Sequence, residues 1–288
     1  MQSRANPYKR GFPASKNRLP PVFLTVKTRF LLPLRACIPF GLLALLAVSP
    51  AQADKKEDKK DEKADAPAAE AGKSVIPDVP LDDPDGIGQR GDAAFAKGDW
   101  MNAAANYNAL IKIGVKVGAP AESMEPLYFV LGVCMFNLPN YDEAYKRFTE
   151  YTQKYPTGPK VHQANLAIAR IFRAQKKWAD AVKQYKPLMN VPQMKDDVLI
   201  ELADAHKENQ EKDKAIVLLE TTLATGLKSI PDVRAALYLV ELYQDDKPEK
   251  GVAMLDKVKM APGARAVVSE INFAAMKLAD SLMGSDKY

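Results

Sequence analysis

The sequence predicts an all-α protein, built as a solenoid of about five helix pairs and closed by one further helix at its C-terminal end. Three observations lead to this prediction. One residue pattern recurs along the chain, its copies follow one another at roughly 34 to 40 residues, and an amphipathic run follows the last copy. Self-similarity at this period is typical of helical repeat arrays, in which each repeat buries its apolar face against its neighbours.

The recurring pattern has four positions. A small residue is followed by an aromatic or polar residue, then by a second small residue, and then by an apolar residue. The first small residue lets two antiparallel helices approach closely, and the other three positions seat the second helix against the first. The pattern positions are Gly91, Trp100, Ala103 and Tyr107 in the first copy; Gly132, Tyr141, Ala144 and Phe148, with the helix-stopping Pro156, in the second; Ala169, Trp178, Ala181 and Tyr185 in the third; Ala203, Lys212, Ala215 and Leu219 in the fourth; and Leu239, Pro248, Gly251 and Leu255 in the fifth.

The copies divide the chain into repeats and a cap. The fourth copy has lost its aromatic residue and the fifth is degenerate, as expected near the end of a solenoid, where a repeat meets solvent on one side. Between the first two copies the spacing is longer, and Gly114, Gly118 and Pro120 predict an extra loop there. The repeats are expected at 84–117, 125–158, 162–195, 196–229 and 232–265, with the capping helix at 264–284.

This pattern resembles the tetratricopeptide repeat (TPR) family over roughly residues 84–265, most closely in the second and third copies. The resemblance implies a right-handed superhelical solenoid over 84–288 and a function in protein binding. The run Tyr-x-x-Ala-x-x-x-Phe-x-x-Tyr-x-x-x-Tyr-Pro, which begins at Tyr141, resembles more narrowly the exported bacterial repeat proteins of the Tol-Pal-associated cell-division coordinator type. That similarity implies a scaffold that holds partner proteins in the cell envelope.

In TPR arrays the first helix of each repeat lines a concave groove. The aromatic groove positions would anchor apolar side chains of a ligand, and Arg170 with Arg173 would take a carboxylate. Two alternatives stay open: Phe129 and Phe136 pack between neighbouring helices, and the arginine pair is a solvated face. Reversing both arginine charges is expected to abolish partner capture without changing the fold. The candidate groove residues are Phe95, Phe129, Phe136, Asn137, Arg170, Arg173, Lys207 and Tyr243.

One subclass of the family is excluded by its binding positions. Members that bind chaperones hold a C-terminal carboxylate with Lys and Asn side chains at set groove positions. The corresponding positions in this chain are Gly88, Asp92, Val130, Gln163 and Ala167. We therefore do not expect a chaperone-type carboxylate clamp.

The first 53 residues predict a secretory signal peptide. Eight basic residues and no acidic one precede Asp54, an apolar stretch covers 36–48, and Ala51 and Ala53 supply the small residues of a cleavage site. Translation from Val26 would give a signal of ordinary length, so we expect the true start there. If the segment stays uncleaved it anchors the protein in the inner membrane, and only there does the sequence predict membrane contact.

Residues 54–83 are expected to form a disordered linker, first charged and then rich in proline. The chain after Ala53 holds 33 basic residues against 36 acidic ones, so the overall charge of +5 belongs to the leader. The basic balance therefore gives no support to nucleic-acid binding.

No catalytic constellation, metal site or cofactor is predicted. The glycines at 86, 88 and 91 have the spacing of a dinucleotide fingerprint but follow a loop where that motif needs a strand. His162 and His206 lie in different repeats, without further ligands at metal spacing. Cys134 lies in an apolar helical run, where a small buried side chain is expected.

Together these features predict a periplasmic scaffold that binds envelope proteins through its groove, with residues 125–190 as the place of contact. A membrane-anchored chaperone for secreted chains and an enzyme with an unrecognised site remain as alternatives.

Overall fold

The computed structural model describes residues 76–285. The predicted signal peptide (1–53), the start at Val26 and the linker as far as residue 75 lie outside the described residues. The last part of the predicted linker, residues 76–83, has no helix. There Asp78 accepts a hydrogen bond from Lys112 at 2.8 Å, which ties this segment to the first repeat.

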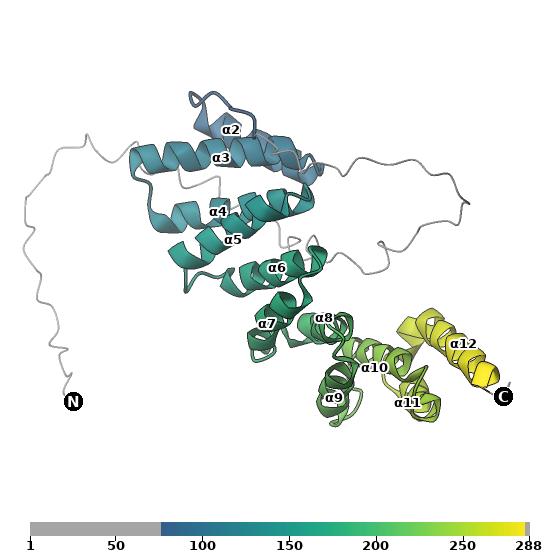
Figure 1. Ribbon diagram of the computed structural model, residues 1–288. Coiled ribbons are helices and arrows are strands. Elements are labelled where there is room, and N and C mark those ends of the chain that lie inside the picture. The colour runs from purple at the N-terminus through teal and green to yellow at the C-terminus, as the bar shows by residue number, and fades with distance from the viewer. Residues whose placement is uncertain (1–75, 286–288) are drawn as a thin grey trace, which may run out of the picture. The chain divides into compact units, whose positions relative to one another are not determined.

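The described residues form eleven α-helices, one 3-10 helix and no strand, which confirms the all-α class with five helix pairs and a final helix (Figure 1). The pairs are α2 (Pro84–Ala96) with α3 (Trp100–Val117), α4 (Ala121–Asn137) with α5 (Tyr141–Lys154), α6 (Val161–Ala174) with α7 (Trp178–Leu188), α8 (Lys195–Glu208) with α9 (Lys212–Leu223), and α10 (Ile230–Tyr243) with α11 (Pro248–Met260). The 3-10 helix η2 (Ala264–Val267) and α12 (Val268–Ser285) follow.

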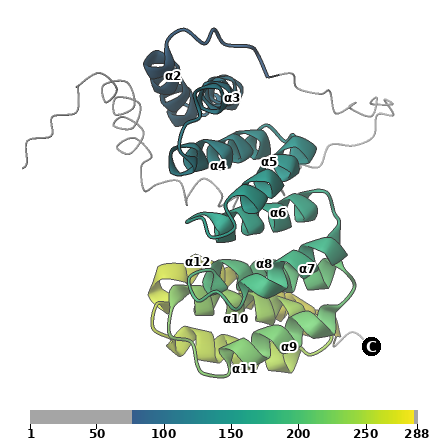
Figure 2. The ribbon, with the colours of Figure 1, turned by 90° about the vertical axis from the view of Figure 1, so that its left-hand side faces the viewer.

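Each helix packs against the next along the chain, and in the C-terminal part alternate helices also contact one another. There α10 contacts both α8 and α12. Figures 1 and 2 show α8, α10 and α12 side by side, with α9 and α11 below them. The first helices of the last two repeats and the final helix therefore form one layer.

Side chains in the connecting turns start several of the helices. Asp83 accepts a hydrogen bond from the Gly86 amide at 3.0 Å, and Asp99 accepts one from the Asn102 amide at 3.3 Å. Ser229 and Asp232 form a capping box at the start of α10. Such caps satisfy amides that have no partner inside the helix, which places the helix starts next to these polar turns.

The small residues of the repeat pattern lie where two helices meet. Gly132 faces the Phe148 ring so closely that a Cβ on it would lie 2.9 Å from two ring carbons. A side chain at this position would push the two helices of the second repeat apart. The pattern alanines are completely buried in the same way: Ala103, Ala144, Ala169, Ala181, Ala203 and Ala215.

The predicted extra loop between the first two repeats is wrong. Helix α3 continues through Gly114 as far as Val117, and α4 begins at Ala121, so only three residues connect them. Gly114 lies inside the helix, and its missing Cβ lets α4 pack closely, because a Cβ there would lie 2.2 Å from the Met124 Sδ atom. The additional residues lengthen the helices instead of forming a loop.

Helix α12 covers the last repeat with one face only. Ile271 and Leu278 are buried against α10 and α11, whereas Phe273 and Met276 are both 55% exposed. Within residues 76–285, no helix combines the length and the apolar character needed to cross a membrane.

Candidate functional site

A groove of about 950 Å³ lies between α6, α8, α10 and α12. Three first helices of repeats and the terminal helix contribute to it, so it follows the layer of helices described above. Ile200, Tyr238, Phe273 and Ala274 provide partly or fully exposed apolar surface in it. Charged side chains from all four helices surround this surface.

Three of the predicted groove residues line this groove: Arg170, Arg173 and Lys207. The groove therefore reaches beyond the 125–190 segment on which the sequence focused, as far as Leu278. The reason is that α8, α10 and α12 form its walls, and only α6 belongs to the predicted segment.

The arginine pair already holds a carboxylate, but one from the protein itself. Arg170 donates to Glu201 of α8 through Nε at 3.0 Å and through a terminal nitrogen at 2.5 Å, and Arg173 lies 3.8 Å from the same carboxylate. The Tyr185 hydroxyl also donates to Glu201, at 2.7 Å. Glu201 therefore occupies the place that the sequence analysis expected a ligand carboxylate to take beside the two arginines.

Both side chains of this ion pair are largely buried, with 12% of Arg170 and 16% of Glu201 exposed. Burial opposes the charged form of Arg170, but the hydrogen bonds to Glu201 raise its pKa. The arginine pair is therefore neither a solvated face nor an open carboxylate receptor. Reversing both charges would bring two more carboxylates to Glu201, so we now expect this double change to destabilise the fold as well.

Phe129 and Phe136 pack between helices, as in the alternative that the sequence left open. Phe129 is 2% exposed and its ring lies edge-on to Phe148 and Tyr151 of α5. Phe136 is buried beside Tyr141. Neither ring lines the groove, because α4 turns this apolar face towards its partner helix.

Phe95 and Asn137 also lie away from the groove. Phe95 is half-buried and its ring contacts Trp100 and Tyr107 within the first repeat. The Asn137 amide donates to the Val133 carbonyl of its own helix at 2.9 Å. The structure therefore does not bring the N-terminal candidates together with those of α6 and α8.

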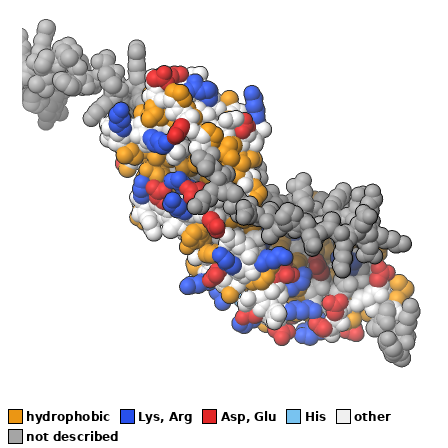
Figure 3. All heavy atoms as spheres, turned by 45° about the horizontal axis from the view of Figure 1, so that its top comes forward, with side chains coloured by type: hydrophobic (Ala, Val, Ile, Leu, Met, Phe, Trp, Pro, Cys, Tyr) orange, Lys and Arg blue, Asp and Glu red, His pale blue; other side chains and the backbone are white. Residues whose placement is uncertain are grey.

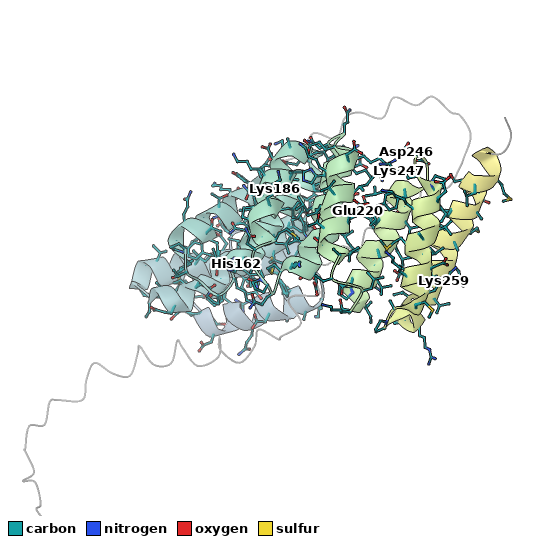
Figure 4. The ribbon with its side chains drawn as sticks, turned by 90° about the horizontal axis from the view of Figure 1, so that it is seen from below. His162, Lys186, Glu220, Asp246, Lys247 and Lys259 are labelled. Carbon is teal, nitrogen blue, oxygen red and sulfur yellow. The ribbon has the colours of Figure 1, made fainter. Side chains whose placement is uncertain are left out.

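Tyr243 is buried, with 2% of its surface exposed, and points to the opposite side of α10. Its hydroxyl donates to Glu220 of α9, and Lys250 lies 5.7 Å from its ring centroid. Figure 4 shows Glu220 near the turn that carries Asp246 and Lys247, before α11. Tyr243 therefore joins the second-helix layer instead of the groove.

The sequence missed the contribution of α12 to the groove. Phe273 and Lys277 both line it, with the Lys277 Nζ atom 4.8 Å from the Phe273 ring centroid. The sequence contained a signal for this contribution. Apolar residues of α12 include Phe273 and Met276, which are not needed for the buried face that Ile271 and Leu278 form. The interpretation of this run as a cap alone was incomplete, since a helix that caps one repeat on one face is free to bind on another.

Carboxylates of the groove differ in their surroundings. Burial raises the pKa of Asp197 above its usual range, although the positive charge of Arg170 opposes this rise. Asp204 accepts a hydrogen bond from the Tyr238 hydroxyl at 3.0 Å. Burial, followed by the charge of Asp204, raises the pKa of Tyr238, so this hydroxyl stays a donor.

The structure also places the other residues that the sequence considered for chemistry. Among residues 76–285, no cluster of three or more His, Cys, Asp or Glu side chains is placed to hold a metal ion. The fingerprint glycines lie within helix α2, where Gly91 packs against Asn106 and Tyr107. Cys134 is completely buried, and this burial raises the pKa of its thiol to about 12. On the face shown in Figure 3, basic and acidic side chains are interspersed.

Part of the chain resembles known proteins in sequence. Residues 89–159 match the family model described as tetratricopeptide repeat. No curated protein matches the chain in sequence.

One solved protein, in two crystal structures, has a fold similar to part of this chain. The TPR-like repeats of a candidate kinesin light chain from Podosopora anserina are similar with a TM-score of 0.51 and 16% identity, over 62% of this chain and 96% of that one. A single-residue variant of that protein gives the same score and identity over 94% of its length. A MamA protein follows with a TM-score of 0.48 and 17% identity, over 62% of this chain and 90% of that one.

The fold of these repeats is typical of scaffolds for interactions between proteins. Residues 89–159 match the model of the tetratricopeptide repeat family, and the described chain has a TPR-like fold.

Proposed function

We propose that the protein is a periplasmic scaffold that binds partner proteins through the groove between α6, α8, α10 and α12. The observation that carries this proposal is the groove itself, in which partly exposed apolar side chains are surrounded by charged ones. An apolar centre with a polar rim is the composition of a protein interface. Its position on the first helices of a TPR-like array supports the same use.

Phe273 makes this proposal testable, because it lies in the groove and is 55% exposed. Replacing it with a photo-reactive phenylalanine should cross-link a discrete set of envelope proteins in the living cell. Met276 is equally exposed on the same helix but does not line the groove, so the same replacement there is the matched control. Equal cross-linking from both positions, or from neither, would contradict binding in the groove.

The proposed periplasmic location rests on the predicted signal peptide and has a separate test. Amino-terminal sequencing of the mature protein should begin at Asp54, after the Ala51-Gln52-Ala53 site. A mature protein that keeps residues 36–53 would support the membrane-anchored chaperone instead. A role in envelope maintenance or division then predicts that the cross-linked partners are envelope proteins.

A further inference from the structure

We infer that the groove takes a basic segment of a partner protein, in which positively charged side chains flank an apolar one that packs on Phe273. This inference rests on the proposed function and specifies the chemistry of the partner. It depends on which charges of the groove are already neutralised within the protein and which are left for a ligand.

The cations of the groove are mostly neutralised from within. Arg170 and Arg173 share Glu201, as described above. Lys207 lies 3.9 Å from Glu208 and 3.8 Å from Glu241. Arg234 of α10 pairs with Glu270 of α12 at 3.1 Å. An acidic ligand would have to displace these internal carboxylates, so the groove is poorly suited to one.

The carboxylates, in contrast, exceed the cations. Seven carboxylates and five cationic side chains line the groove. Asp196, Asp197 and Asp204 form no ion pair with any described residue, whereas Lys277 is the only lining cation without one among residues 76–285. The residual charge is therefore negative, and it attracts Lys and Arg side chains.

The apolar part of the groove supplies the second requirement. Phe273 presents an exposed ring, with Ile200, Tyr238 and Ala274 exposed in part beside it. Burying such a ring under an aliphatic or aromatic side chain gives binding energy that charges alone do not. A purely basic segment without an apolar side chain should therefore bind weakly.

The other occupants that the chain itself offers fit less well. The segment 54–73 contains six lysines and seven acidic residues, so its charges cancel. A second copy of the chain after residue 53 carries slightly more acidic than basic residues, so it offers the groove no net positive charge. The basic leader fits by charge, but the proposed cleavage removes it. A partner protein is the occupant that matches both the charge and the apolar surface.

The test uses purified full-length protein and three fluorescent probe peptides of equal length. They are (KLAKLAK)₂, its charge-reversed form (ELAELAE)₂, and its apolar-deficient form (KSAKSAK)₂. Fluorescence anisotropy should show that the first binds at least about tenfold more tightly than the other two, and that salt weakens its binding. Tight binding of the acidic peptide, or equal binding of all three, would overturn the inference.

Variants assign this binding to the groove. Asp196→Asn with Asp197→Asn should weaken it about two- to tenfold, and Phe273→Ala at least about fivefold. The matched control for charge is Asp180→Asn with Asp213→Asn, since these exposed residues also lie in the first turns of helices but do not line the groove. Met276→Ala is the control for Phe273. Equal losses of affinity in the variants and in their controls would overturn the inference. A peptide of residues 1–35 is a fourth probe, and the inference would also be overturned if this peptide bound more tightly than the other three.

Failure here and failure of the proposed function can be told apart. If the acidic probe binds and the cross-link from position 273 persists, the protein is a groove-binding scaffold with a different preference. If the cross-link is also absent, the scaffold proposal falls as well.

Discussion

Arg170 of α6 and Glu201 of α8 form a bidentate ion pair that joins the third repeat to the fourth, with two donor nitrogens at 3.0 and 2.5 Å from the carboxylate oxygens. An exposed pair, Arg234 of α10 with Glu270 of α12, joins helices of the same layer at 3.1 Å. The two pairs differ in burial, because the side chains of the second are 53% and 45% exposed, and Glu201 has Arg173 and Tyr185 as further partners. They allow the effect of burial to be measured within one fold.

We expect Arg170→Met to destabilise the protein by about 3 kcal/mol, because it leaves Glu201 partly buried without its main counter-charge. Arg234→Met should cost less than about 1 kcal/mol, since its pair is exposed to solvent. Urea unfolding followed by circular dichroism measures both. Equal costs for the two variants would show that burial does not determine the strength of these contacts.

Gly132→Ala should lower the free energy of unfolding by about 1 to 3 kcal/mol, because its Cβ would lie 2.9 Å from the Phe148 ring. Gly88→Ala in α2 is the control, since the nearest side-chain atom, on Leu110, would lie 3.9 Å from its Cβ. A helical glycine with this much space gains up to about 1 kcal/mol on replacement by alanine. Thermal melting of both variants tests the close approach of α4 and α5.

Lys176→Gly should stabilise the protein by about 1 kcal/mol, because the left-handed region of the backbone is unfavourable for residues with a Cβ. Lys176 has a φ of 57°, which lies in that region. The first repeat has Gly98, with a φ of 73°, at the equivalent position two residues before its tryptophan. Lys183→Gly, in the interior of α7, should instead lose about 1 kcal/mol, so a loss at position 176 on thermal melting would contradict the argument.

The Glu211 carboxylate predicts a pH dependence. Hydrogen bonds from Lys214, and then from His206, lower its pKa to about 2, from an ordinary value of 4.5. A carboxylate whose pKa is depressed on folding contributes stability above its unfolded pKa and loses it as the pH falls towards the folded one. The melting-temperature advantage of the wild type over Glu211→Gln should therefore be full at about pH 6 and shrink between about pH 4.5 and 2.

Glu249→Gln is the control for this effect, because Glu249 is exposed in the first turn of α11 and forms no ion pair with any residue from 76 to 285. Its difference from the wild type should be nearly constant over the same pH range. A constant difference for Glu211→Gln as well would rule out the proposed coupling.

The local pattern was sufficient to predict the helix pairs. Trp100, Tyr141, Trp178 and Lys212 each begin the second helix of a repeat, as their common place in the pattern predicts. The pattern acts locally, because the residues that contact one another within one helix pair are close in sequence. The extra loop was predicted wrongly because Gly114 and Gly118 look alike in sequence. Only Gly118 has a positive φ, whereas Gly114 stays helical against Met124.

The candidate site was predicted in part. Arg170, Arg173 and Lys207 line the groove as the family geometry implied, but each has a counter-charge from another repeat. Glu201 lies 31 residues after Arg170, and no local pattern pairs the two. The aromatic candidates were wrong as surface anchors, since Phe129, Phe136 and Tyr243 are buried.

The sequence by itself determined the class of fold, the order of the helix pairs and the positions where small residues let helices meet. These follow from periodicity and from the volume of single side chains, which act over short distances along the chain. Only the tertiary structure decided which charges are neutralised internally and that Phe273 of the capping helix faces the groove. Both depend on how helices distant in sequence are rotated against one another, because that rotation selects which side of an amphipathic helix is buried and which remains exposed.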